Sequence, residues 1–408
     1  MRNIINKNFW ILTLMGISSG LPLSLTGGTL HAWLKTEGVS TAAIGWFALV
    51  GLPYTWKFVW APLMDRFTYP FLGRRRGWML VTQLLLIILI AVLGQLSPKT
   101  DLYLISVIAF FVAFVSASQD VVLDAWRREQ LTPQEFGWGN GIHVTGYLFA
   151  MRLLSGSLAL IMSDHVSWSV VYLTMAGLQG LGVIATLWSK ESNTSIAPPK
   201  SLKEAVVAPF LDFFSRDRAM VVLAFILFYK LGDNMASQMT MPFYLEMGYS
   251  KTQIGGITKI FGWAGIALGT FLGGLWLRYL SVYRGLFIFG LLQMLSTFGF
   301  SILVYLPKTE LHLTWVILFE NISAGMGTAA FVTFIGLMTN KQFTATQFAL
   351  LSSVMGIPRV FIAAPTGHLA EYLGWFGFFA LCTLVAIVGL ALIKLLPSID
   401  DHQSPKGQ

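Results

Sequence analysis

Charged side chains are scarce in this sequence of 408 residues. They make up 11% of the chain, whereas they make up about a quarter of a soluble domain. Hydrophobic residues reach 55%, and the mean hydropathy is +0.68. So few charges cannot cover the surface of a water-soluble fold, and the composition therefore predicts an integral membrane protein.

Cysteine is rarer still, because Cys382 is the only one in the chain. A single thiol excludes an internal disulfide and argues against a cysteine metal cluster. The sequence also has no glycine-rich phosphate loop, no His/Glu zinc pattern and no nucleophile elbow. We therefore expect no enzymatic activity, no bound metal and no cofactor.

Long apolar runs are abundant, and each is long enough to cross a bilayer as a helix. They lie at 9–33, 42–65, 77–97, 101–126, 138–163, 167–188, 218–245, 252–277, 284–306, 311–339, 344–372 and 374–396. The first run is too long for the core of a signal peptide and is interpreted as a retained span. Together the runs predict an all-α membrane protein with twelve transmembrane helices.

Lysine and arginine are distributed unevenly between alternate loops. With both termini in the cytoplasm, eighteen basic residues fall on that side: Arg2, Lys7, Arg66, Arg74, Arg75, Arg76, Arg127, Arg128, Lys190, Lys200, Lys203, Arg216, Arg218, Arg278, Arg284, Lys341, Lys394 and Lys406. The opposite side has four: Lys35, Lys99, Lys251 and Lys308. This bias predicts cytoplasmic termini. The net charge of +8 thus follows from loop sorting, and no nucleic-acid partner is expected.

The chain contains an internal repeat. The segment Pro98–Leu102 recurs as Pro307–Leu311, and Arg76-Gly77 recurs as Arg284-Gly285. Three further residues keep their spacing in both copies: Arg152, Asp164 and Trp168 recur as Arg359, Glu371 and Trp375. Like-oriented repeats in a membrane chain predict two six-helix bundles related by a pseudo-twofold axis, with a substrate path between them.

The repeat also predicts the domain organisation. We expect an N-terminal bundle at 1–190 and a C-terminal bundle at 218–408. The linker at 191–217 mixes charged and apolar residues from Ser201 onward, which predicts an amphipathic helix on the cytoplasmic leaflet.

Two motifs resemble a known family. The loop after the second run has Ala61–Arg66, six further residues and then Gly73–Trp78, which resembles the loop signature of the major facilitator superfamily in a stretched form. Together with Ser118–Trp126 (SQDVVLDAW), the stretched loop resembles the AmpG-type permeases and the related acetyl-CoA transporters. The resemblance implies proton-driven import of anhydromuropeptides across the bacterial inner membrane. A single-subunit permease for another anionic solute, such as a ferric siderophore, remains the alternative.

Ionisable side chains at membrane depth point independently to a transport function. Each costs about 2.5–3.5 kcal/mol near the bilayer centre and normally faces a cavity or a partner. The nine candidates are Lys57, Asp120, Asp124, Arg152, Lys230, Asp233, Lys259, Glu320 and Arg359. Their basic surplus favours an anionic substrate.

Arg152 and Arg359 occupy matching places in the two halves, so we expect both to face a central cavity. Guanidinium groups bind carboxylates bidentately, which predicts that the two arginines bind the substrate. Lys57 and Lys230 are predicted to bind it as well, through their positive charge. The alternative is that each arginine pairs with a neighbouring acid or with carbonyl groups and locks helices together. The deeper aromatic residues predicted to form a glycan-facing wall are Tyr147, Trp56 and Trp263.

Proton coupling requires a group that both gains and loses a proton, and Asp120, Asp233 and Glu320 are the candidates. For Asp233 the alternative is a self-satisfied pair with Lys230, three residues earlier. For Glu320 the alternative is a hydrogen-bonded structural acid.

A third group lies at the predicted cytoplasmic ends of the helices. It consists of Asp65, Arg66, Arg74, Arg75 and Arg76, with Asp124 and Arg127 as expected partners. Such a group can hold neighbouring helices together in one transport state, although retention of loops by the arginines explains part of the pattern. We expect a monomer whose partners are protons, the lipid bilayer and a small anionic substrate.

Overall fold

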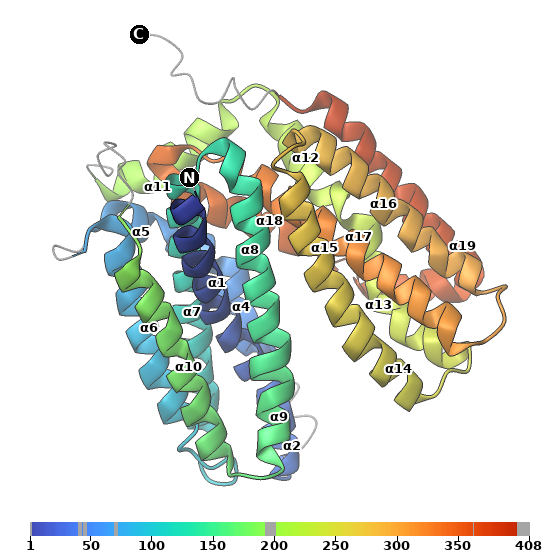
Figure 1. Cartoon of the computed structure of the whole chain (residues 1–408), viewed down its shortest axis with the longest axis horizontal. Coiled ribbons are helices and arrows are strands. Elements are labelled where there is room, and N and C mark those ends of the chain that lie inside the picture. The colour runs from blue at the N-terminus through green and yellow to red at the C-terminus, as the bar shows by residue number, and fades with distance from the viewer. Residues whose placement is uncertain are drawn as a thin grey trace. The chain divides into compact units, whose positions relative to one another are not determined.

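The computed structural model describes residues 2–39, 43, 47–68, 72–191, 201–361 and 363–397. Within these ranges, side chains are described except at 2–7, 48, 133–134, 202–203, 251–252, 259, 341, 356–361 and 363–365. Helices joined by short loops and turns make up most of the described chain (Figure 1). An all-helical fold follows from the apolar composition, because a helix satisfies its own backbone hydrogen bonds in lipid.

The elements follow one another along the chain, and their bounds are given in two groups. The first group is α1 (Arg2–Leu25), α2 (Gly28–Thr36), η1 (Phe47–Gly51), α4 (Leu52–Trp56), η2 (Lys57–Val59), α5 (Ala61–Arg66), α6 (Arg74–Leu93), α7 (Leu102–Gln130), α8 (Pro133–Phe149), η3 (Ala150–Leu158), α9 (Ala159–Ser163) and α10 (Trp168–Trp188). The second group is α11 (Leu202–Phe214), α12 (Ala219–Tyr229), α13 (Leu231–Glu246), α14 (Lys251–Ile257), η4 (Thr258–Gly262), α15 (Trp263–Trp276), α16 (Val282–Leu303), α17 (Glu310–Leu337), η5 (Lys341–Phe343), α18 (Thr344–Phe361), α19 (Ala363–Leu392) and η6 (Ile393–Leu395).

Ten helices in the described ranges are long and apolar enough to cross a membrane. The predicted run at 42–65 is divided among η1, α4, η2 and α5, and part of that run lies outside the described residues. The run at 344–372 also includes an undescribed position. The multi-span character is therefore established, and the count of twelve stays a prediction.

The chain forms two compact units, and each is described by itself. The first contains Met1–Thr132, Ile142–Pro209 and Thr339–Ser353. The second contains Pro133–Gly141, Phe210–Met338 and Val354–Gln408. Each unit thus includes a short piece from the other half of the sequence.

An apolar core fills each unit. In the first, α6, α7 and α10 meet around side chains such as Ile90, Val112 and Tyr172. In the second, α13, α16 and α19 meet around rings that include Phe243 and Phe300. One glycine in each unit adopts a left-handed backbone of nearly the same geometry, with φ of +85° at Gly38 and +81° at Gly248.

Close backbone contact between α1 and α8 depends on glycine. A Cβ atom at Gly20 would collide with the backbone of Tyr147, whereas a Cβ atom at Gly177 on α10 would meet nothing within 4 Å. Gly20→Ala is therefore expected to lower stability by about 1–3 kcal/mol through overpacking. Thermal unfolding in detergent measures this effect, with Gly177→Ala as the matched control. Equal melting temperatures for the two variants would contradict the prediction.

Candidate functional site

Asp65, at the end of α5, is fully buried and surrounded by hydrogen-bond donors. Arg74 Nη2 donates to Asp65 Oδ1 over 2.9 Å, and Arg75 Nη2 donates to the same oxygen over 2.8 Å. Two ion pairs compensate for the loss of hydration that a buried carboxylate suffers. We call this group of residues the gate cluster. It consists of Asp65, Arg74, Arg75, Thr346, which binds the second oxygen of Asp65, and Glu129, which binds Arg75.

The other carboxylate oxygen of Asp65 binds the beginning of α18. The backbone N–H and the hydroxyl of Thr346 donate to Asp65 Oδ2 over 2.9 and 2.7 Å. The first N–H groups of a helix lack partners within the helix and carry partial positive charge, so a carboxylate is favoured there. These contacts lie inside the first unit, yet they join α5 of the first sequence half to α18 of the second.

Sequence reasoning missed two acids that complete this region. Glu129 accepts hydrogen bonds from Arg75 Nε over 3.0 Å and Arg75 Nη2 over 2.5 Å. Glu191 accepts from the backbone N–H groups of Arg75 and Arg76 over 2.9 and 3.0 Å, and so caps α6. Both are acids in segments that are otherwise basic, which marks them in the sequence without showing which residues they bind.

The remaining predicted gate residues lie elsewhere. Asp124 pairs with Arg127 over 2.6 Å on their own helix, and neither supplies a recorded partner of Asp65. Arg76 donates through Nε to the carbonyl of Thr186 on α10. Arg66 lies over the ring of Phe67, with 5.7 Å from Cζ to the ring centre.

Asp120 on α7 is half-buried and accepts a hydrogen bond of 2.5 Å from the hydroxyl of Ser19 on α1. Lys57, which is 9% exposed, lies near enough to interact electrostatically with this carboxylate. The structure therefore brings one predicted proton carrier close to one predicted substrate residue. Glu320 on α17 accepts from the side-chain amide of Asn321 over 2.8 Å.

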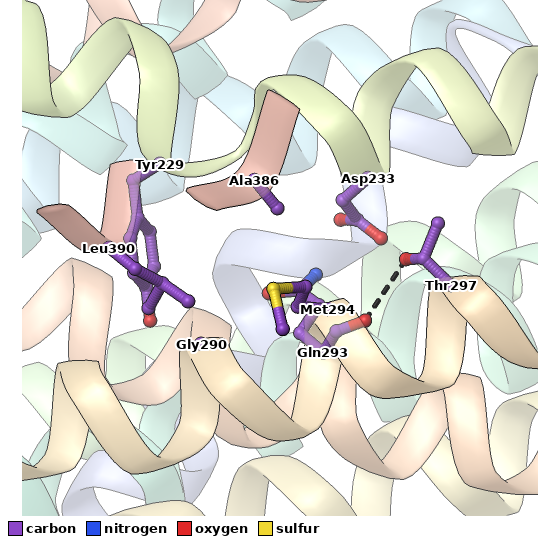
Figure 2. Close-up of a pocket in the computed structure, with 8 residues that line it drawn as sticks. All are labelled: Tyr229, Asp233, Gly290, Gln293, Met294, Thr297, Ala386 and Leu390. Atoms are coloured by element: carbon purple, nitrogen blue, oxygen red, sulfur yellow. Dashed lines mark hydrogen bonds between the residues drawn. The ribbon is translucent and has the colours of Figure 1, made fainter. Parts of the chain in front are cut away.

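Asp233 on α13 faces a small pocket in the second unit (Figure 2). Lys230 Nζ lies 3.5 Å from Asp233 Oδ2. The ion pair that the sequence analysis gave as the alternative for Asp233 therefore forms. Both side chains are largely buried, with exposed fractions of 10% and 20%.

The predicted substrate residues are more dispersed. Arg152 is exposed on η3, a π-helical segment that continues α8, and such segments occur frequently at functional sites. Tyr147 is half-buried one turn earlier, Trp263 is half-buried at the start of α15, and Trp56 is 57% exposed. The side chain of Arg359 lies outside the described residues.

A bundle of membrane-length helices, polar residues at depth and a buried ionic cluster at helix ends define a membrane transporter. The sequence profile described as Major Facilitator Superfamily matches residues 12–363, and the chain belongs to this superfamily. The relatives named below are a permease and a putative transporter, so the chain is a transporter rather than an enzyme and has a small-molecule substrate.

Individual relatives narrow the family to the AmpG group, which confirms the resemblance seen in the sequence. The chain is 43% identical over 385 residues to the anhydromuropeptide permease of Escherichia coli strain K12, covering 94% of this chain and 78% of that protein. It is 32% identical over 393 residues to putative transporter AmpG 4 of Rickettsia felis, covering 94% and 95% of the two chains.

Solved structures agree on the fold. The proton:xylose symporter XylE superposes with a TM-score of 0.72 at 12% identity, over 96% of each chain. FucP in its outward conformation superposes with a TM-score of 0.70 at 14% identity, over 94% of this chain and 98% of that one. Identities this low establish the fold alone.

Proposed function

We propose that the protein imports anhydromuropeptides across the bacterial inner membrane, coupled to protons, by alternating access. The observation that carries this proposal is the 43% identity with an anhydromuropeptide permease along 94% of the chain. The named relatives favour this substrate over the ferric siderophore alternative. The basic surplus among the charges at membrane depth fits a substrate that carries carboxylates.

In this proposal, twelve helices form two six-helix bundles at 1–190 and 218–408, joined by a linker at 191–217 whose helix α11 lies on the cytoplasmic leaflet. Exposed apolar residues on α11 support that placement: Val206, Val207, Leu211 and Phe214. Both termini are cytoplasmic and the protein acts as a monomer. The bundles rock about the substrate, as membrane carriers with parallel repeats do.

Contacts between the two sequence halves supply the gate. The gate cluster joins α5 to α18 within the first unit. Within the second unit, Asn140 on α8 donates to the hydroxyl of Thr333 on α17 over 3.1 Å. By the predicted topology both contacts lie at cytoplasmic helix ends, so breaking them opens the path to the cytoplasm.

The proposed roles of the side chains follow from their chemistry. Arginine and lysine anchor the anionic substrate, aromatic rings face its sugars, and carboxylates carry protons. The substrate residues are Arg152, Arg359, Lys57, Lys230, Tyr147, Trp56 and Trp263. The candidate proton carriers are Asp120, Asp233 and Glu320. The gating residues are Asp65, Arg66, Arg74, Arg75, Arg76, Asp124 and Arg127.

Uptake into inverted and right-side-out membrane vesicles tests the function directly. Radiolabelled anhydromuropeptide is expected to accumulate when a proton gradient is imposed, and an uncoupler is expected to abolish accumulation. Unlabelled anhydromuropeptide should compete, and a ferric siderophore should not. Accumulation that persists with the uncoupler, or competition by the siderophore alone, would refute the proposal.

Arg152→Ala is expected to reduce uptake at low substrate concentration by about 10- to 100-fold, because a hydrogen bond to a charged group is worth about 1.5–3 kcal/mol. Arg152→Lys keeps the charge without the bidentate geometry, so its uptake should lie between that of the wild type and that of Arg152→Ala. Membrane abundance should stay unchanged. Lys99→Ala, which breaks an exposed ion pair with Glu37, is the control. Wild-type uptake by Arg152→Ala would remove this residue from the substrate site.

A further inference from the structure

A break in the first membrane helix of the second unit places an ammonium group inside the protein. α12 ends at Tyr229, α13 begins at Leu231, and Lys230 between them has φ of −102° and ψ of 6°. Lys230 is buried, so its charge depends on protein partners.

The Lys230 ammonium has three N–H donors and three oxygen partners. Asp233 Oδ2 lies 3.5 Å away, Gln293 Oε1 accepts over 3.1 Å, and the carbonyl of Ala324 accepts over 3.4 Å. Two of the three acceptors are neutral. The ammonium therefore keeps two hydrogen bonds whether or not the carboxylate is charged.

Gln293 has a second feature that its contact with Lys230 does not explain. Its oxygen faces the lysine, because an ammonium can only donate, and this fixes the side-chain nitrogen on the other side. That nitrogen, Nε2, is buried and has no hydrogen-bond partner among the described residues. Gln293 is only 5% exposed, so an unpaired donor there points to a missing ligand.

The pocket that Gln293 lines has a volume of about 10 Å³, which is room for a single water molecule. Asp233 from α13, and Gln293 and Thr297 from α16, line it with polar side chains, together with Tyr229 from α12, whose hydroxyl donates to the carbonyl of Leu286. Figure 2 shows the Asp233 carboxylate and the Thr297 hydroxyl at the same end of the pocket. Besides Lys230, the titratable side chains of Tyr229 from α12 and Cys382 from α19 lie near enough to Asp233 to interact with it electrostatically.

We propose that this pocket binds one water molecule between the Gln293 amide and the Asp233 carboxylate, and that this water delivers the coupling proton to Asp233. The water accepts a hydrogen bond from Gln293 Nε2. One O–H bond of the water breaks as an O–H bond to Asp233 forms, and the water regains its proton from the medium. Gln293 is the positioning residue, since it holds both the water and the ammonium. The inference rests on the proposed proton-coupled function.

Two variants separate coupling from substrate binding. Gln293→Leu removes the amide, and Ala386→Leu fills the pocket while leaving all three oxygen partners of Lys230 in place. In proteoliposomes, Ala386→Leu should retain exchange of labelled for unlabelled anhydromuropeptide within about twofold of wild type, because exchange needs no net proton movement. Accumulation driven by an imposed pH gradient should fall at least tenfold. Gln119→Leu removes a buried glutamine bonded to Ser18 and should keep the wild-type ratio of accumulation to exchange.

The outcomes are distinct. Wild-type accumulation and pH dependence in both variants would overturn the inference. A parallel loss of exchange and accumulation in both would also overturn it, because that result assigns a structural role to the cluster. If Gln293→Leu alone loses exchange, the accumulation by Ala386→Leu is decisive. A loss of accumulation with intact exchange in Ala386→Leu supports the water, and wild-type accumulation overturns it. Failure of the proposed function is recognised separately, as accumulation by the wild-type protein that an uncoupler does not reduce.

Discussion

Asp65→Ala is expected to abolish uptake and to lower stability by about 3–5 kcal/mol, the typical cost of removing one partner from a buried ion pair. The substitution leaves two buried guanidinium groups with Glu129 as their remaining carboxylate, and it removes the anion from the beginning of α18. Asp65→Asn keeps the size and one hydrogen-bond acceptor but not the charge. Its uptake and stability should therefore lie between those of the wild type and Asp65→Ala. Uptake normalised to membrane abundance, together with the melting temperature in detergent, measures both effects.

Asp217→Ala is the control for this prediction. The Asp217 side chain is 80% exposed and lies 3.6 Å from Arg218, and an exposed pair of this kind contributes about 0–1 kcal/mol. The variant should therefore transport and unfold as the wild type does. An Asp65→Ala protein with normal uptake would show that the gate cluster holds no transport state together.

Asp120→Asn is expected to abolish accumulation while leaving substrate exchange intact. One proton moving down 100 mV supplies about 2.3 kcal/mol, which supports roughly 50-fold accumulation. Coupling is expected to need the carboxylate of Asp120 as well as that of Asp233, and an amide cannot take up a proton, although it still accepts the hydrogen bond from Ser19. Accumulation and exchange in proteoliposomes, measured with and without a pH gradient, separate the two activities.

Ser19→Ala supports the same test, because it removes the hydrogen bond and keeps the carboxylate. It should shift the pH dependence of accumulation and preserve coupling. If Asp120→Asn still accumulates substrate and an uncoupler abolishes this accumulation, Asp120 does not carry the proton. Coupling would then need Asp233, beside the water pocket, but not Asp120.

The fold class and the family were predictable from the sequence. Apolar run length predicts membrane helices, and ten of them form in the described residues. The boundary predicted between the runs ending at 372 and starting at 374 is visible as a break at Gly374, where φ is +67°. The broken second run was not predictable, because hydropathy does not distinguish one long helix from four short ones.

Some residues of the candidate site were predictable from the sequence, and others were not. Composition identified the charges at membrane depth, and the i, i+3 spacing identified the pairing of Lys230 with Asp233. Spacing along one helix could not identify Glu129, Glu191 or Gln293 as partners, because their contacts join helices far apart in the sequence.

The sequence by itself determined that this protein spans the membrane several times, because the hydrophobicity of each run is a local property of the chain. Two short motifs then indicated the permease family. Only the tertiary structure decided which charges meet. Asp65 binds the start of α18 rather than Asp124 or Arg127, because the backbone donors of a helix become available to an acid only when packing brings them together. Packing likewise left the Gln293 nitrogen facing a pocket of water size.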